Sequence, residues 1–165
     1  MLNLSKDIKM IVSDFDGVFT DGSVYISEKN DVQKKLNFKD IMGVHLLITN
    51  GFDFGIISGE ASNILNYFKD NFKLNEIYGG IRQKGIVLAE IMQRKNLKSN
   101  EVLYIGDDIN DIAAMELVDF KIAPKNVNPI LPIKVQNLQI TEAYGGNGAI
   151  REIADKLLEI KCSLN

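Results

Sequence analysis

Short apolar runs alternate with amphipathic helical patterns along this 165-residue chain. Strand-like runs are expected at residues 8–14, 52–58, 76–78, 101–105, 120–123 and 138–140. Helices are expected between and after them at residues 40–50, 61–72, 83–95, 113–117, 126–133 and 149–161. This alternation predicts a single α/β domain over residues 1–165, a Rossmann-like three-layer α/β/α fold in which helices cover both faces of a parallel sheet.

A hairpin interrupts the alternation after the first strand. Residues 23–27 and 32–38 read as its two arms, and the polar residues 28–31 read as its turn. Asp40 is expected to cap the following helix, and Gly51 is expected to end it. We therefore predict a hairpin insertion over about residues 23–38, and a glycine-containing tail over about residues 143–165.

Composition excludes several classes of protein. A net charge of -3 and a pI near 5.2 argue against a protein that binds nucleic acid through its phosphates. The apolar runs are much shorter than the roughly 20 residues that cross a bilayer, so no membrane association is expected. The N-terminus lacks the pattern of a secretory signal, which favours a cytoplasmic protein. The single cysteine, Cys162, cannot form an internal disulfide, and a catalytic thiol is not expected there.

Polar residues gather where the predicted strands end. In a parallel sheet, ligands bind at the carboxyl ends of the strands. The residues expected there, or at the start of a following helix, are Asp14, Asp16, Ser58, Gly59, Lys84, Gly106, Asp107, Asp108 and Asp111. Five carboxylates in one crevice require a compensating cation. Mg²⁺ fits oxygen ligands, whereas zinc has no cluster of Cys or His residues to bind it.

The same residues suit phosphoryl transfer. Lys84 and Ser58 can donate to the outer oxygens of a phosphoryl group. One aspartate can act as a nucleophile and form an aspartyl phosphate, while a second, two residues along, protonates the leaving group. Each residue alone has an ordinary explanation, such as a solvated turn or an exposed helix position. Their joint occurrence at strand and helix boundaries favours a metal-assisted phosphoryl-transfer enzyme.

Four segments resemble the motifs of the haloacid dehalogenase superfamily. They are DFDGVFTDG, ISGE, the lysine of GGIRQKG, and GDDINDIAAM. The hairpin and the later GGNGAIRE are similar to the capless branch of that superfamily. This branch contains phosphatases of 3-deoxy-D-manno-octulosonate (KDO) 8-phosphate and of nine-carbon 2-keto-3-deoxy sugar acids (KDN) related to sialic acid. The resemblance therefore implies a Mg²⁺-dependent hydrolase that releases phosphate from a sugar-acid phosphate.

The resemblance also implies individual roles. Asp14 would be the nucleophile and a metal ligand, and Asp16 would be the general acid/base and a metal ligand through its backbone carbonyl. Asp107 would complete the metal site, while Asp111 and Asp108 would support the metal ligands without binding the metal themselves. The residues implied to bind the phosphoryl group are Ser58, Gly59 and Lys84.

Assembly is implied by the same resemblance. Capless relatives form homotetramers in which the hairpins pack at the centre and the tail of one subunit reaches a neighbouring active site. Gly145, Gly146 and Arg151 would then be candidates for contact with the substrate, and Arg151 suits a carboxylate. A plain surface arginine is an equal alternative. Lys34 and Lys35 are expected on the hairpin surface.

One position departs from the octulosonate phosphatases. They usually carry arginine after the glycine of ISG, whereas this chain has Glu60. A glutamate resembles the nine-carbon phosphatases, so the choice between eight and nine carbons stays open, with a slight preference for nine.

Two other classes of function fit the sequence less well than a phosphatase does. A phospho-accepting signalling domain places its acidic pair early, whereas GDDIND comes last in this chain. A non-catalytic or oligomerising module, such as one associated with a sialic acid cytidylyltransferase, would not need Asp14, Asp16, Lys84 and Asp107 together.

Overall fold

The computed structural model describes residues 2–163 and contains one six-stranded sheet in which all strands are parallel. The strands occur in the spatial order β5-β4-β1-β6-β7-β8. Their bounds are β1 Met10–Ser13, β4 Asp53–Ile57, β5 Glu76–Tyr78, β6 Val102–Ile105, β7 Phe120–Ala123 and β8 Gln139–Ile140. The predicted α/β/α sandwich is confirmed.

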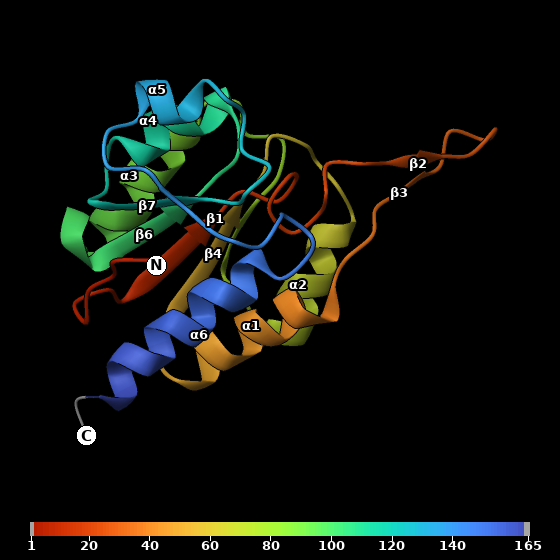
Figure 1. Ribbon diagram of the computed structural model, residues 1–165. Helices are drawn as coiled ribbons and strands as arrows, with labels where there is room; N and C mark the ends of the chain where they lie inside the picture. The colour runs from red at the N-terminus through yellow and green to blue at the C-terminus, as the bar shows by residue number, and fades with distance from the viewer. Residues whose placement is uncertain (1, 164–165) are drawn as a thin grey trace.

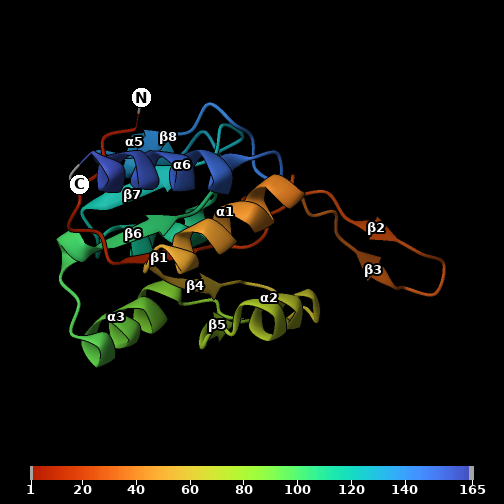
Figure 2. The same cartoon turned by 90° about the horizontal axis from the view of Figure 1, so that it is seen from below.

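Helices cover both faces of this sheet (Figures 1 and 2). On one face lie α1 (Phe38–Thr49), α2 (Ile64–Phe72) and α6 (Ala149–Cys162). On the other lie α3 (Lys84–Lys95), α4 (Ile112–Met115) and α5 (Leu131–Lys134), with the short 3₁₀ helices η1 (Ser99–Glu101) and η2 (Ile109–Asp111) at the ends of β6. The predicted helix at 126–133 is thus shorter and later than expected.

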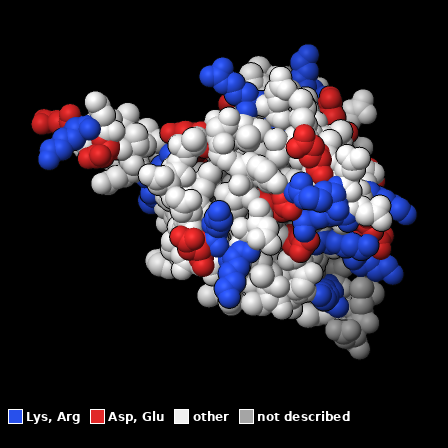
Figure 3. All heavy atoms as spheres, turned by 180° about the vertical axis from the view of Figure 1, so that it is seen from behind, with Lys and Arg blue, Asp and Glu red and all other residues white. Residues whose placement is uncertain are grey.

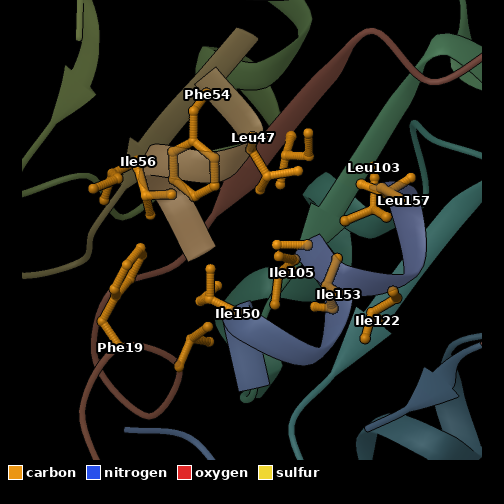
Figure 4. Close-up of a cluster of buried hydrophobic side chains, with 14 of the residues drawn as sticks. Phe19, Leu47, Phe54, Ile56, Leu103, Ile105, Ile122, Ile150, Ile153 and Leu157 are labelled. Atoms are coloured by element: carbon orange, nitrogen blue, oxygen red, sulfur yellow. The ribbon is translucent and has the colours of Figure 1, made fainter. Parts of the chain in front are cut away.

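Two apolar cores result from strand alternation. Successive strand side chains point to opposite faces, so Ile11 joins the core beneath α1 and α6, whereas Met10 and Val12 join the core beneath α3 and α4. Figure 4 shows the first core, where Ile150 and Ile153 of α6 lie over the central strands. Burial on both faces explains why the central strands are almost continuously apolar.

The hairpin projects away from the body of the molecule (Figure 1). Its paired segments, β2 (Tyr25–Ile26) and β3 (Val32–Gln33), are shorter than the predicted arms. Within the described residues, this hairpin is what the chain inserts between β1 and α1, so no separate cap domain stands there.

The start of α1 differs from the prediction. Asn37 is the N-cap, and its side chain accepts a hydrogen bond from the amide of Lys39. Asp40 instead reaches across to α6, where its carboxylate accepts hydrogen bonds from the amides of Gly148 and Ile150, both at 2.9 Å. A helix N-terminus leaves amides without helical partners, so a carboxylate from α1 can satisfy them.

The surface carries mixed charge. On the face seen in Figure 3, acidic and basic side chains are interspersed rather than separated into fields of one sign. Among residues 2–163, no helix combines the length and the hydrophobicity that crossing a membrane requires.

Candidate active site

Neighbouring strands bring the predicted site residues to one edge of the sheet. Asp14 directly follows β1, and its amide donates to the carbonyl of Ile105 at the end of β6. Ser58 directly follows β4, and its amide donates to the carbonyl of Tyr78 at the end of β5. Strands β4 and β5 continue the sheet on one side of β1, whereas β6, β7 and β8 continue it on the other side. The site therefore lies at a topological switch point, where ligands bind in open α/β sheets.

A buried lysine joins two of the aspartates. Lys84, the first residue of α3, places its ammonium 2.6 Å from Asp14 Oδ2 and 2.8 Å from Asp111 Oδ1. Burial lowers the pKa of Lys84, but the two carboxylates raise that pKa by more, so the net shift is upward. The lysine is therefore a permanent cation beside Asp14.

Asp111 organises the loop after β6. Its Oδ1 also accepts a hydrogen bond from the hydroxyl of Tyr104, and its Oδ2 accepts from the amides of Asp107 and Asp108. Burial and the nearby carboxylates raise the pKa of Tyr104 far above its usual range, so the hydroxyl keeps its proton and donates. Asp111 thus holds the loop through Oδ2 and joins it to Lys84 and Tyr104 through Oδ1, while its role as an anchor behind a metal site stays a prediction.

Three carboxyl groups converge at this edge. Single oxygens of Asp14, Asp107 and Asp111 lie within 4.8 Å of one another. Burial and, next, the charge of Asp111 raise the pKa of Asp14 to about 7. Burial and, next, the charge of Asp14 raise the pKa of Asp107 to about 7 as well. Ionising neighbouring carboxyl groups together is costly, and a bound divalent cation offsets this cost by compensating their negative charge. The donor set therefore fits a hard metal ion.

Gly17 leaves the room that this arrangement needs. Its φ is +76°, and a Cβ at this position would lie 1.9 Å from Asp107 Oδ2. The loop is closed by Thr20, whose buried hydroxyl accepts from the amides of Gly17 and Gly22 at 3.2 Å. Glycine is thus required for the β1 loop to approach the β6 loop.

Asn126 was not singled out from the sequence, yet it supports the same loop. Its amide nitrogen donates to the carbonyl of Gly17 at 3.1 Å, and its side-chain oxygen accepts from the amide of Gly145 at 2.6 Å. The amide of Gly146 donates to the carbonyl of Val18 at 2.8 Å. The two tail glycines therefore pack against the β1 loop of their own chain, and contact with a neighbour's substrate stays a prediction.

A model of haloacid dehalogenase-like hydrolases matches residues 54–149, more than half of the chain. The chain belongs to this family. The 3-deoxy-D-manno-octulosonate 8-phosphate phosphatase of Yersinia pestis is 29% identical over 158 residues, which are 96% of this chain and 83% of the relative. The corresponding Escherichia coli K12 phosphatase is 27% identical over 93% of this chain and 81% of its own length.

Solved structures agree with these relatives. The Yersinia pestis phosphatase crystal structure has a TM-score of 0.89 and 30% identity, covering 96% of this chain and 85% of that one. The Moraxella catarrhalis phosphatase, solved with a magnesium ion, a phosphate ion and a KDO molecule, has a TM-score of 0.87 and 25% identity, covering 96% and 92%. The predicted family and the prediction of a phosphomonoester hydrolase are confirmed, since the family is one of hydrolases and these relatives are phosphatases.

The ISGE turn, which directly follows β4, lies beside the same edge. The buried hydroxyl of Ser58 accepts a hydrogen bond from the amide of Glu60 at 3.2 Å. A Cβ on Gly59 would lie in ordinary contact, 3.5 Å from the side-chain nitrogen of Asn110. Asn110 therefore faces the ISGE turn, a placement that its position in GDDIND did not reveal.

Two predicted residues have contacts away from Asp14. The carboxylate of Asp108 accepts from the amide of Ile109 and from the side chain of Asn128, both at 2.7 Å, so it caps η2. Arg151 pairs along α6 with Asp155 at 2.7 Å. Within one chain, Arg151 therefore has a surface partner, and its contact with a substrate stays a prediction.

Lys34 corrects the sequence analysis. Its side chain is only 3% exposed, whereas that of Lys35 is 60% exposed. The Lys34 ammonium lies 2.8 Å from Asp16 Oδ1 and 2.5 Å from Glu60 Oε2. The prediction of a surface lysine is therefore wrong for Lys34 and confirmed for Lys35.

Proposed function

We propose that this protein is a Mg²⁺-dependent phosphatase of a 2-keto-3-deoxy sugar-acid phosphate, acting through an aspartyl phosphate on Asp14. The placement of Asp14 carries the proposal. Its Oδ2 contacts the Lys84 ammonium at 2.6 Å, and its Oδ1 accepts from the amide of Phe15 at 2.6 Å. A carboxylate held in this way, at the switch point and beside Asp107, is oriented for attack on a bound phosphoryl group.

The proposed reaction has two steps. Asp14 attacks phosphorus, the bond from phosphorus to the sugar oxygen breaks, and Asp16 gives a proton to that oxygen. Asp16 then takes a proton from water as the water attacks the same phosphorus, which releases phosphate and restores the Asp14 carboxylate. Ser58 and Lys84 would donate to the phosphoryl oxygens, where negative charge gathers.

The metal would be held by Asp14, Asp107 and the backbone carbonyl of Asp16. When bound, Mg²⁺ neutralises the clustered carboxylates and the charge of the phosphoryl group. The raised pKa values of Asp14 and Asp107 support a cation at this position. Asp111 would stabilise the site indirectly, since its own oxygens accept hydrogen bonds from Lys84, Tyr104 and the loop amides.

Two sugar-acid phosphates, one with eight carbons and one with nine, are the candidate substrates. The relatives named as octulosonate 8-phosphate phosphatases favour an eight-carbon acid. Glu60 favours a nine-carbon acid of the KDN or sialic acid type, because the eight-carbon phosphatases usually have arginine there. Glu60 lies at the rim of the site, where its carboxylate pairs with Lys34.

A phosphate-release assay tests the proposal. The purified protein with Mg²⁺ is offered eight-carbon and nine-carbon sugar-acid phosphates, a hexose phosphate, a nucleotide and an aryl phosphate. We expect a sugar-acid phosphate to have the highest kcat/KM, and Glu60→Arg to shift the ratio towards eight carbons. A preference for nucleotides would overturn the substrate class, and no release from any compound would favour the oligomerising module.

We also propose a homotetramer assembled through the hairpin. The support is an apolar surface on the projecting hairpin and on the adjoining first residue of α1. The exposed residues are Val24, Tyr25, Ile26, Val32 and Phe38, with exposures from 46% to 82%. Light scattering should give four chains for the wild type and fewer for Tyr25→Ser/Ile26→Ser; a wild-type monomer would contradict the assembly.

A further inference from the structure

Lys34 leaves the hairpin and enters the site. It directly follows β3 (Val32–Gln33), whose side chains are exposed, but its own side chain is almost fully buried. The ammonium contacts both carboxylate oxygens of Asp16, at 2.8 and 2.9 Å, and lies 5.7 Å from the centre of the Phe15 ring. The hairpin is thus connected to the loop that carries the proposed acid/base.

Glu60 completes a chain of three charged groups. Its Oε2 lies 2.5 Å from the same ammonium, so Lys34 bridges the loop after β1 and the loop after β4. Burial lowers the pKa of Lys34, but the carboxylates of Asp16 and Glu60 raise that pKa by more. The lysine therefore remains charged and paired, as a buried ammonium requires.

We propose that Lys34 is a positioning residue that orients the Asp16 carboxyl for proton transfer to the leaving group, with Glu60 as its second anchor. This inference rests on the proposed phosphatase function. The Lys34 ammonium contacts both Asp16 oxygens. Its contact with Glu60 Oε2 holds the ammonium from the loop after β4 as well, so the position of Lys34 does not depend on Asp16 alone.

The arrangement also changes how Glu60 acts. A bare carboxylate at the rim would repel an anionic substrate, but Lys34 compensates its charge at 2.5 Å. Next to this pair lies a hollow of about 300 Å³, lined by Val32, Lys34, Glu60, Ala61, Ser62, Asn63 and Ile64. A substrate in this hollow would meet an ion pair rather than an isolated negative charge.

The test compares leaving groups. The best sugar-acid phosphate from the phosphate-release assay is an alkyl phosphate, so its leaving oxygen needs a proton. The leaving group of 4-nitrophenyl phosphate is 4-nitrophenolate, a stable anion that needs none. We expect Lys34→Met to lower kcat/KM for the alkyl phosphate at least about tenfold more than for the nitrophenyl ester, since general acid catalysis contributes roughly 10²–10⁴. Because kcat/KM reports the steps up to formation of the aspartyl phosphate, the later water attack does not obscure the comparison.

Matched variants complete the design. Lys35→Met, on the neighbouring exposed lysine, should leave the ratio of the two substrates unchanged, and Lys34→Arg should restore part of it. Glu60→Gln should change the ratio in the same direction but by less, and it serves if Lys34→Met fails to fold in thermal unfolding. Equal losses for both substrates, or no loss, would overturn the role of Lys34. An inactive wild type would instead refute the proposed function itself.

Discussion

The ammonium of Lys84 lies 2.6 Å from Asp14 Oδ2, and neither side chain is more than 6% exposed. A buried ion pair adds little net stability, because removing both charges from water costs about as much as their attraction returns. Removing one partner is different, since the other charge is left buried and unpaired. Lys84 is thus tied both to the nucleophile and to the stability of the site.

Lys84→Met should destabilise the protein by about 3–5 kcal/mol in urea unfolding at pH 8, because Asp14 and Asp111 lose their common cation. The matched control is Lys95→Met. Lys95 pairs with Asp53 at 2.9 Å on the surface, and loss of that pair should cost less than about 1 kcal/mol. A similar decrease in the free energy of unfolding for the two variants would mean that the buried pair contributes no more to stability than the surface pair.

Asp14→Asn should reduce phosphate release at least about a thousandfold, because an amide cannot form the aspartyl phosphate. Folding should be retained, since the side chain keeps its size and its place after β1. The control is Asp70→Asn on the exposed surface of α2, which should keep wild-type turnover. Full activity of Asp14→Asn in the assay would exclude Asp14 as the nucleophile.

Gly17→Ala should abolish most Mg²⁺-dependent turnover. The new Cβ would lie 1.9 Å from Asp107 Oδ2, so either the β1 loop or the proposed metal ligand must move. Gly22→Ala is the matched control, because Gly22 also has a positive φ, +82°, but a Cβ there meets nothing within 4 Å.

Both alanine variants share the backbone strain of about 1 kcal/mol, which thermal unfolding measures. A difference in turnover between them therefore reports the contact with Asp107. If Gly22→Ala lost as much activity as Gly17→Ala, strain in the loop would be the explanation instead.

Asp40→Ala should lower the free energy of unfolding by about 1–3 kcal/mol, because the amides of Gly148 and Ile150 lose a buried acceptor. Asp155→Ala, which removes the partner of Arg151 on the exposed face of α6, should cost less than about 0.5 kcal/mol. Chemical denaturation measures both. Equal stability of Asp40→Ala and the wild type would show that water replaces the carboxylate at the start of α6.

Much of the fold and the centre of the site follow from local patterns. Apolar runs and helical spacing locate most strands and helices to within a few residues, with the largest errors at the start of α5 and at the end of β3. Because parallel strands end at one edge of the sheet, the sequence alone predicts that Asp14, Ser58 and Asp107 lie together. The family motifs then supplied roles that spacing alone did not assign.

Only the tertiary structure decided the contacts that span the chain. Asp40 reads locally as a helix cap but binds α6, 108 residues away at Gly148, and Asn126 joins Gly17 to Gly145. Lys34 and Lys35 are adjacent and chemically identical, yet the backbone direction after β3 buries one beside Asp16 and leaves the other in solvent. A sequence pattern determines which element a residue joins, whereas the packing of distant elements determines which charges meet.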